Sequence, residues 1–590
     1  MPPSLCQRNL GLIKISESVG KPEVEEAIVA VVLSRFVLLH KFSIFTVHPD
    51  APRTLDDEEQ SACRCVRMIR VDKPRPSKYS KMSRLILKGA PLAHNFQNCG
   101  FLSVLPNCLA TKAKLRGQNR FMSGIVQSPL GPCKKIPNEN IVEHIYKNNE
   151  NWIEEPAATC ASSGRTYTYG MLRMLINRCA QALLGHCGMK PREVVGLLLP
   201  NIPEYIIICH GAIEAGLTVT FVNPLYTPDE IKRQFENAGV KMIVTVPILL
   251  EVATTIAPQL QDYRTTVCIG GEDDPSKNVH SLQSLLAGGH EAELPGINPR
   301  EIAILPYSSG TTGLPKGVML SHYNLVANLA QGDHPALYDL ETKDGRRHTV
   351  LTVLPFFHIY GFNAILNLSL KNGAHIVTLP KFTPEEYIKT LVQYKPTFVF
   401  VVPSLLLFLA THPAVTKEHL SSVESVQSGA APLTEGLLQK FRQKIGRDDV
   451  LIRQGYGMTE SAPVALCMPK LTPPSKIGTV GVPYPGTEAK IISLSTGEPL
   501  GTHKSGELLV RGPQLMMGYL NNDQATAETI DEDGWLHTGD VAYYDEDHYF
   551  YLVDRCKELI KVKGNQYQKW IYLCYSFKKV SPDLQIDLNG

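Results

Sequence analysis

Residues 307–317 read Tyr307-Ser308-Ser309-Gly310-Thr311-Thr312-Gly313-Leu314-Pro315-Lys316-Gly317, and this stretch decides how the rest of the chain is interpreted. It gathers serine and threonine hydroxyls, three glycines and one lysine within eleven residues. Glycines let backbone amides approach an anion, hydroxyls donate to phosphoryl oxygens, and a lysine supplies a mobile positive charge. The composition of the segment therefore predicts a phosphate-binding loop.

The residues on either side of this loop predict a strand before it and a helix after it. The apolar run 302–305 is typical of a buried strand, and Ser321 is a good N-cap for a helix that starts at the next residue. Anions are commonly held where a strand passes into a helix N-terminus. We therefore expect the loop to lie at a strand-to-helix junction.

Two other interpretations of the loop are a nucleotide-binding loop of the common type and a flexible surface linker. The common nucleotide-binding loop needs Gly-x-x-x-x-Gly-Lys-Ser/Thr, whereas Lys316 is followed by Gly317 at a different spacing. A kinase or a GTPase is therefore disfavoured. A flexible surface linker would have a similar Ser/Thr/Gly composition.

The loop resembles, over all eleven residues, the signature loop of the adenylate-forming enzymes, which include acyl-CoA synthetases, beetle luciferases and the adenylation domains of peptide synthetases. The resemblance extends from about Gly124 to Gln566. It implies an α/β fold: a large N-terminal body of parallel sheets flanked by helices, a small β-barrel-like subdomain, and a C-terminal lid. It also implies ATP, Mg²⁺ and coenzyme A as cofactors and co-substrates, and a small carboxylic acid as substrate.

Length and composition agree with such an enzyme. A chain of 590 residues with 43% hydrophobic content is expected to form more than one domain. A net charge of +2 gives no reason to expect a nucleic-acid partner. The 14 cysteines are scattered, which suits a reducing compartment, and the pair Cys63 and Cys65 lacks the second pair that a metal site would need.

The chain divides into regions of different texture. Strands alternate with helices from residue 194 onward, which predicts parallel sheets covered on both faces, and short strands with Gly and Pro turns follow from about Gly478. The predicted regions are 1–81, an uncertain extension; 82–123, a basic segment; 124–475, the α/β AMP-binding body; 476–554, the β-rich subdomain; and 555–590, a hinge with a lid remnant and a divergent tail.

The basic segment bears on localisation. No acidic residue occurs between Asp72 and Glu139, and Met82 opens a basic, hydroxyl-bearing stretch typical of mitochondrial targeting segments. A disordered basic linker is the alternative. Many relatives are peroxisomal through a C-terminal tripeptide that the ending 588–590 does not supply, and a cytoplasmic location stays open. The apolar stretch 28–47 is interrupted by charges, so no transmembrane span is expected.

The resemblance assigns roles to individual residues. For the nucleotide and its metal it implies Ser308, Ser309, Gly310, Thr311, Thr312, Lys316, Ala430, Gln454, Gly455, Tyr456, Thr459, Asp540, Arg555, Lys557, Lys561 and Gln566, with Glu460 as the magnesium ligand. For the acid it implies His358, Tyr360, Ala364 and Gly429, and for coenzyme A it implies Lys381, Lys563 and Gly564. Thr311, Lys316, His358, Thr459 and Glu460 would act in the reaction itself.

Within these assignments Tyr456 offers a flat face to adenine, Thr459 a hydroxyl to the α-phosphate, and Asp540 an acceptor to the ribose hydroxyls. One glutamate suffices for magnesium, since that ion takes one or two carboxylates and completes its shell with substrate phosphates.

The similarity stops after Gln566, where the family continues into its lid with a catalytic lysine. Removing one preorganised stabiliser commonly costs roughly 10²–10³ in rate. We therefore expect impaired adenylation in the chain as written, from an alternative ending or an error in the gene model.

Three functions follow from these observations. The first is an ATP-dependent acid–CoA ligase for an aryl or fatty acid, since motifs such as His358-Ile359-Tyr360-Gly361 resemble 4-coumarate–CoA ligase and its animal relatives. Ala364 stands where phenylpropanoid-specific relatives often carry a hydroxyl, which leaves fatty acids open. The alternatives are a luciferase-like adenylating monooxygenase and a catalytically defective isoform that binds nucleotide or acyl ligand. Oligomeric state is not predicted.

Overall fold

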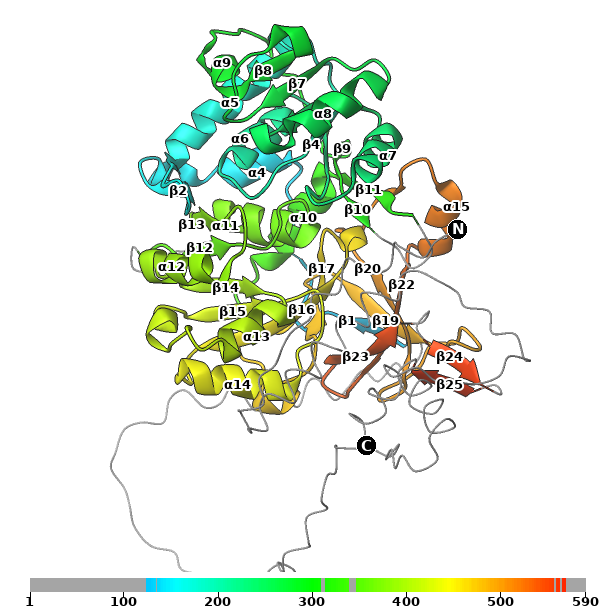
Figure 1. Cartoon of the computed structure of the whole chain (residues 1–590). Coiled ribbons are helices and arrows are strands. Elements are labelled where there is room, and N and C mark those ends of the chain that lie inside the picture. Colours follow the sequence, from blue (N-terminus) through cyan, green and yellow to red (C-terminus); the bar gives the residue numbers. More distant parts are fainter. Residues whose placement is uncertain are drawn as a thin grey trace, which may run out of the picture. The chain divides into compact units, whose positions relative to one another are not determined.

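Two largely parallel sheets, built from alternating strands and helices, form most of the structure (Figure 1). The computed structural model describes residues 124–133, 135–308, 314–338 and 346–555, and the backbone of 559–562 and 565–568. The predicted extension 1–81, the basic segment 82–123 and the tail after residue 568 lie outside the described residues. The boundaries predicted between regions stay predictions.

The first sheet has nine strands in the order β10-β11-β9-β5-β4-β6-β7-β8, with β21 paired to β11. Its strands are β4 (Val194–Leu197), β5 (Thr218–Phe221), β6 (Val240–Thr245), β7 (Thr265–Cys268), β8 (Val279–Ser281), β9 (Ile302–Leu305), β10 (Tyr307–Ser308), β11 (Lys316–Ser321) and β21 (Gly518–Tyr519). Its associated helices are α5 (Tyr169–Gly185), α6 (Glu204–Glu214), α7 (Pro228–Ala238), α8 (Leu250–Ile256) and α9 (Leu282–Ala287).

The second sheet also has nine strands, in the order β18-β17-β16-β15-β14-β12-β13-β2-β3. They are β2 (Pro156–Cys160), β3 (Thr166–Thr168), β12 (Thr349–Thr352), β13 (His375–Thr378), β14 (Phe398–Val401), β15 (Ser425–Ser428), β16 (Leu451–Gly457), β17 (Val464–Cys467) and β18 (Val482–Pro483). The helices of this part are α4 (Ile141–Tyr146), α10 (His322–Gly332), the π-helix η5 (Tyr360–Asn367), α11 (Leu368–Lys371), α12 (Pro384–Tyr394), α13 (Pro403–Thr411) and α14 (Glu435–Ile445).

Both sheets contain the same five-strand parallel arrangement. In chain order of their own strands, β5-β4-β6-β7-β8 and β13-β12-β14-β15-β16 both follow the pattern 2-1-3-4-5. Ligands of such sheets bind beyond the carboxyl ends of the strands, next to the point where strand order reverses. In the second sheet that point lies between β12 and β14, so the segments after β12, β14 and β15 are expected to line a site.

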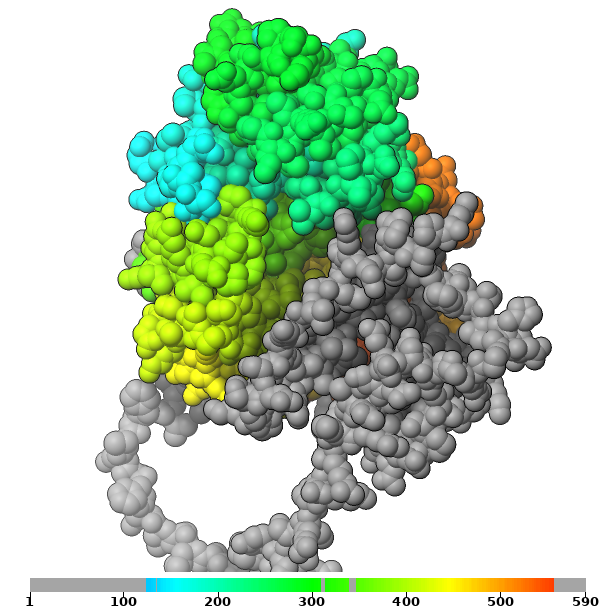
Figure 2. Space-filling view, viewed as in Figure 1, coloured from blue at the N-terminus to red at the C-terminus, as the bar shows by residue number. Residues whose placement is uncertain are grey.

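One hydrophobic core is shared by the two sheets. Side chains of the first sheet and its helices, such as Leu197 and Tyr205, belong to the same buried cluster as Phe356, Phe362 and Val377 of the second. The rings of Tyr205 and Phe356 have centroids 5.4 Å apart in an edge-to-face arrangement. Figure 2 shows the corresponding cyan-to-green and yellow-green surfaces meeting without a gap between them.

The β-rich part is an open antiparallel sheet in the order β1-β19-β20-β22-β23. Its strands are β1 (Ile125–Gln127), β19 (Glu488–Ile492), β20 (Gly506–Arg511), β22 (Leu536–Tyr544) and β23 (Phe550–Arg555), and α15 (Asp523–Thr529) precedes β22. Within the described residues this sheet ends at β1 and β23 and does not close into a barrel. β24 (Leu559–Val562) and β25 (Asn565–Gln568) form a separate hairpin.

The predicted strand-to-helix position of the phosphate loop is wrong. Residues after the loop form β11, which pairs antiparallel with β10, so the loop joins the two arms of a β-hairpin. The helix α10 begins only at His322, and there the predicted cap is confirmed: Ser321 accepts a hydrogen bond from the Asn324 amide in a capping box. The six residues of β11 separate the loop from the helix because they also pair with β9 and β21.

The junction between the β12 loop and the π-helix is packed so closely that only glycine fits. A Cβ atom on Gly361 would lie 2.0 Å from the backbone oxygen of Pro355. Gly361→Ala is therefore expected to lower the free energy of unfolding by about 1–3 kcal/mol, as overpacking usually does. Urea unfolding measures this loss.

The matched control is Gly436→Ala in α14, where a Cβ meets nothing within 4 Å. That change is expected to be neutral or mildly stabilising, because alanine favours helix. Equal stability of the two variants would contradict the packing described for Gly361.

Candidate active site

One continuous segment, Gln454–Glu460, carries much of the predicted nucleotide site. It runs along the end of β16 and into the short turn η7 (Thr459–Ser461). Tyr456, Thr459 and Glu460 are largely buried, at 8%, 8% and 5% exposure. β16 is flanked by β15 and β17, so this segment is held on both sides by main-chain hydrogen bonds.

Glu460 is the point where three distant segments meet. Its Oε1 accepts hydrogen bonds from the Ser308 hydroxyl and from the Tyr519 hydroxyl, each at 2.8 Å. Its backbone oxygen accepts from the Met516 amide at 2.9 Å. Two donors on one oxygen fix the carboxylate, and the described residues place no hydrogen bond on Oε2.

Lys316 lies at the same place. It pairs with Ser308 across the β10–β11 hairpin, and its Nζ lies 4.6 Å from the centre of the Tyr519 ring. A cation at this distance from an aromatic face is attracted by the ring quadrupole. The Ser308 end of the phosphate loop therefore contacts Glu460 directly, while the Lys316 end reaches the ring of Tyr519, whose hydroxyl donates to the same carboxylate.

A second cluster joins the same segment to the β-rich sheet. The Tyr456 hydroxyl donates to Asp540 Oδ2 at 2.7 Å, and Arg555 Nε lies 3.4 Å from Asp540 Oδ1. Asp540 and Arg555 are register partners on β22 and β23. Burial, followed by the Asp540 charge, holds the pKa of Tyr456 well above its usual value, so its hydroxyl remains a donor.

Small or polar groups border this cluster on β15 and β16. Gln454 Oε1 accepts from the Leu433 amide at 2.8 Å, while its buried Nε2 has no partner among the described residues. Ala430 is exposed and has a left-handed backbone, with φ of 70°. Gly455 is half-buried beside Gln427. These residues place small side chains and one unpaired amide donor, that of Gln454, beside Tyr456.

The predicted acid-binding residues also come together. The Tyr360 hydroxyl donates to the backbone oxygen of Gln427 at 3.1 Å, and a Cβ on Gly429 would lie 3.1 Å from the Tyr360 ring. Ala364 lies four residues after Tyr360 in the π-helix and is buried among apolar residues. Tyr360, Ala364 and Gly429 therefore form one wall at the strand ends of the second sheet.

His358 is exposed and comes two residues before Tyr360, the first residue of this wall. Its Nδ1 accepts a hydrogen bond from the Tyr360 amide at 3.2 Å, so Nε2 is the nitrogen that carries the proton in the neutral ring. Desolvation by the surrounding protein lowers the pKa of His358. A neutral donor is thus presented next to the Tyr360 wall.

Several predicted residues cannot be placed. Ser309, Gly310, Thr311, Thr312, Lys557, Lys563 and Gly564 lie outside the described residues. Lys561 and Gln566 are register partners in the β24–β25 hairpin, of which only the backbone is described. Lys381 is exposed just before α12. The roles assigned to all of these residues stay predictions.

Two groups important for this geometry were not predicted from the sequence. Tyr519 belongs to a two-residue strand with no motif around it. Asn201 follows β4, and its side chain donates to the Leu354 oxygen at 2.8 Å and accepts from the Phe356 amide at 2.9 Å, which holds the loop ahead of His358. Its position beyond a predicted strand end was the one available signal.

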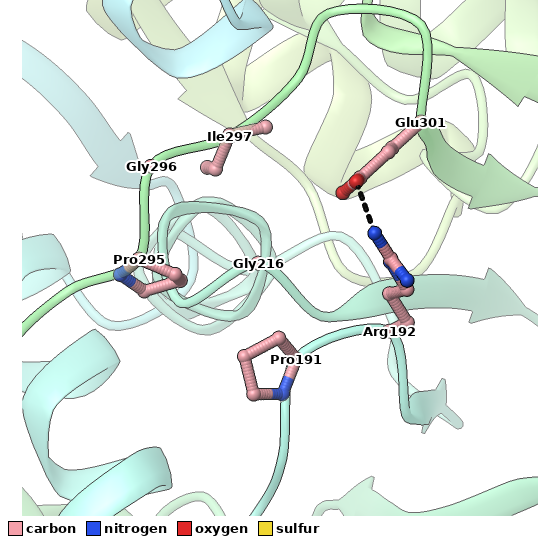
Figure 3. Close-up of a pocket in the computed structure, with 7 residues that line it drawn as sticks. All are labelled: Pro191, Arg192, Gly216, Pro295, Gly296, Ile297 and Glu301. Carbon is pink, nitrogen blue, oxygen red and sulfur yellow. Dashed lines mark hydrogen bonds and ion pairs between the residues drawn. The ribbon is translucent and has the colours of Figure 1, made fainter.

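A surface depression elsewhere does not serve this site. It is lined by Pro191, Arg192, Gly216, Pro295, Gly296, Ile297 and Glu301 (Figure 3). Its volume is about 150 Å³, which is below the range of roughly 300–1,000 Å³ usual for ligand pockets. Arg192 forms an ion pair with Glu301 at 2.7 Å, so its positive charge is already balanced within the protein.

The described residues lack two kinds of feature. They contain no cluster of three or more His, Cys, Asp or Glu side chains arranged to hold a metal ion. No helix in the part of the chain described here has both the length and the apolar character needed to cross a membrane.

The combination of phosphate-loop flanks, a buried carboxylate and an aromatic–acid pair is typical of nucleotide-binding enzymes of the adenylate-forming class. Comparison with known families supports this directly, since residues 146–520 match the model of the AMP-binding enzymes. The chain belongs to the AMP-binding enzyme family.

Curated relatives narrow the class to acid–CoA ligases. The chain is 38% identical over 446 residues to 4-coumarate–CoA ligase of Pinus taeda, covering 73% of this chain and 80% of that protein. It is 38% identical over 466 residues to 4-coumarate–CoA ligase 1 of Arabidopsis thaliana, covering 76% and 81%.

Solved structures agree with the fold. ATP-bound MatB from Rhodopseudomonas palustris is 25% identical with a TM-score of 0.64, covering 73% of this chain and 82% of that one. A long-chain-fatty-acid–CoA ligase from Archaeoglobus fulgidus is 27% identical with a TM-score of 0.64, covering 72% and 86%.

The two donors on Glu460 Oε1 generate a prediction. Ser308→Ala or Tyr519→Phe alone leaves one donor, whereas the double variant leaves a buried carboxylate with neither. We expect each single change to cost about 1 kcal/mol or somewhat more. The double variant should exceed the sum by about 0.5–3 kcal/mol, measured by urea unfolding.

The control pair is Ser308→Ala with Tyr263→Phe, because the Tyr263 hydroxyl bonds Thr266 at 2.7 Å and shares no partner with Ser308. Its effects should add. Additive losses in the first pair as well would contradict a shared acceptor.

Proposed function

We propose that this protein is an ATP-dependent acid–thiol ligase that activates an aryl or fatty acid as an acyl-adenylate and then forms the acyl-CoA thioester. The observation that carries the proposal is the cluster in which Ser308 and Tyr519 donate to Glu460 and Lys316 lies over the Tyr519 ring, next to the segment that carries Tyr456. In the first step a carboxylate oxygen bonds to the α-phosphorus of ATP and the bond to the pyrophosphate breaks. In the second the CoA thiol displaces AMP.

The chain's own residues supply what the first step needs. Two anions must approach each other, so positive charge and oriented donors must offset their repulsion. Lys316 and the hydroxyl of Ser308 lie at the flanks of the phosphate loop, and Thr459 lies one residue before Glu460. Together they would hold the triphosphate while Tyr456, Asp540 and Arg555 hold the nucleoside.

The acid would bind along the wall made by Tyr360, Ala364 and Gly429. His358, neutral and donating from Nε2, would orient the carboxylate at its entrance. The buried cluster beyond it is apolar, with Ala364 packed alongside Val464, Leu337 and Tyr484. This lining supports an acid with an apolar body, of aryl or fatty type.

Glu460 is suited to hold Mg²⁺. Its Oε1 is occupied by two donors, and the described residues leave Oε2 without a hydrogen bond, so the second carboxylate oxygen remains for a cation. A single carboxylate is adequate where phosphates complete the shell. When bound, the ion would neutralise phosphate charge and polarise the phosphoryl oxygens.

The second step depends on groups that stay proposals. Lys381, Lys563 and Gly564 are proposed to contact coenzyme A, and Lys561, Gln566 and Lys557 to contact AMP. A mitochondrial location is likewise proposed from the basic segment that starts at Met82.

The full chain should be tested with ATP, Mg²⁺ and a panel of cinnamic, benzoic and medium- to long-chain fatty acids. Acid-dependent exchange of labelled pyrophosphate into ATP reports the first step, and acyl-CoA detected by mass spectrometry reports the second. Glu460→Gln should lower exchange by roughly 10²-fold, since it removes a charge acting on the transferring phosphoryl group.

The matched control is Glu272→Gln, on an exposed loop after β7. It should leave exchange unchanged. Absence of exchange with every acid would contradict ligase activity in this chain and favour the catalytically defective isoform. Exchange without any thioester, together with oxygen uptake or light on adding luciferin, would favour the luciferase-like alternative.

A further inference from the structure

A chain of buried polar groups runs through the core from α4 to the turn that carries Glu460. The Tyr146 hydroxyl lies 2.9 Å from His210 Nδ1, and His210 Nε2 lies 3.1 Å from Asn367 Oδ1. Asn367 Nδ2 donates to Asn363 Oδ1 at 3.0 Å, and Asn363 Nδ2 donates to the backbone oxygen of Ala462 at 2.7 Å. His210, Asn363 and Asn367 are fully buried.

The last link fixes the direction of every other link. A backbone carbonyl only accepts, so Asn363 must turn its amide nitrogen toward Ala462 and its oxygen toward Asn367. Asn367 then presents its own oxygen to His210, which must carry its proton on Nε2. His210 Nδ1 is left to accept from Tyr146. Burial lowers the pKa of His210 to about 4, in keeping with this neutral tautomer.

The two ends of Asn363 belong to different halves of the proposed site. Its backbone is part of the π-helix that also carries Tyr360 and Ala364, the wall for the acid. The carbonyl that it holds belongs to Ala462, directly after the Thr459–Ser461 turn proposed for phosphate and magnesium. One buried carboxamide therefore connects the acid pocket to the phosphate turn.

We propose that Asn363 is a positioning residue that sets the approach of the acid to the α-phosphate, and that the hydrogen-bond chain from Tyr146 through His210 and Asn367 fixes the orientation of its carboxamide. This inference rests on the proposed function. No member of this hydrogen-bond network touches the reacting atoms. It acts through the relative placement of two walls, and misplacement of about 1 Å can cost roughly 10²-fold in rate.

The decisive variant is Asn363→Leu, which keeps the branched shape of the side chain and removes all its hydrogen bonds, including one to the Leu325 backbone oxygen at 3.4 Å. The maximal rate of acid-dependent pyrophosphate exchange should fall by about 10- to 100-fold. KM for ATP and for the acid should stay close to wild type, because each wall still binds its own ligand. The affinity for ATP, measured by calorimetry, should likewise be retained.

The matched control is Gln331→Leu. Gln331 is also fully buried, and its Nε2 donates to Pro485, Thr487 and Gln514 away from the π-helix. This change should lower Tm at least as much as Asn363→Leu and leave the exchange rate unchanged. A general effect of losing a buried amide is thereby separated from positioning.

A second series tests the orientation of the carboxamide. His210→Leu breaks the chain two links away and should reproduce part of the rate loss. His210→Gln supplies one acceptor and one donor for Tyr146 and Asn367, so its exchange rate should be close to that of the wild type.

The inference is overturned if Asn363→Leu keeps the wild-type exchange rate, if both KM values rise in step with the loss, or if Gln331→Leu shows the same kinetic defect. If the wild-type chain shows no exchange with any of the acids, the proposed function is overturned, and this inference with it. The two failures are distinguished by the wild-type assay alone.

Discussion

The arrangement of the site depends on keeping one buried carboxylate satisfied. Glu460 is 5% exposed, and an ionised group so placed is costly unless it is hydrogen-bonded. Its two side-chain donors come from β10 and β21, which are more than two hundred residues apart in sequence, and its backbone is held by Met516. The hydrogen bonds of Glu460 form only when the β10–β11 hairpin, the turn η7 and the strand β21 meet. The phosphate-loop flanks are placed by the same requirement.

The two repeated sheets divide the work around that point. The carboxyl ends of β12, β15 and β16 provide the acid wall and the nucleotide segment, as the strand order of the second sheet indicates. The first sheet contributes β10 and β11 with Ser308 and Lys316, and its strand β4 ends at Asn201, which holds the loop before His358 through the Leu354 and Phe356 backbone. The first sheet thus supplies part of the proposed phosphate site and supports the loop that leads to His358.

The sequence predicts well what depends on neighbouring residues. The cap at Ser321, the alternation that builds parallel sheets, and the segment Gln454–Glu460 all rest on short-range patterns, and the structure confirms the α/β fold and the cap. The hairpin position of the loop was missed because 316–321 was not recognised as a strand, and part of its pairing is with β21, far away in sequence. Tyr519 and Asn201 were missed for the same reason, since their roles arise only when distant segments meet. The π-helix was missed because 360–367, apolar except for Asn363 and Asn367, would also fit an ordinary helix.

That π-helix combines two demands in one short element. Its widened turn is recorded by the Leu368 amide donating to the Asn363 oxygen five residues earlier. Tyr360 and Ala364 are four residues apart, and so are Asn363 and Asn367, so each pair lies along one side of the helix. One side offers an apolar wall to the acid, and the other carries an amide ladder into the core. Because the two pairs are separate, the wall residue Ala364 can change in size without breaking a link of the ladder. Under the proposed function, the lining of the acid site can therefore change shape while the hydrogen bond from Asn363 to Ala462 stays in place.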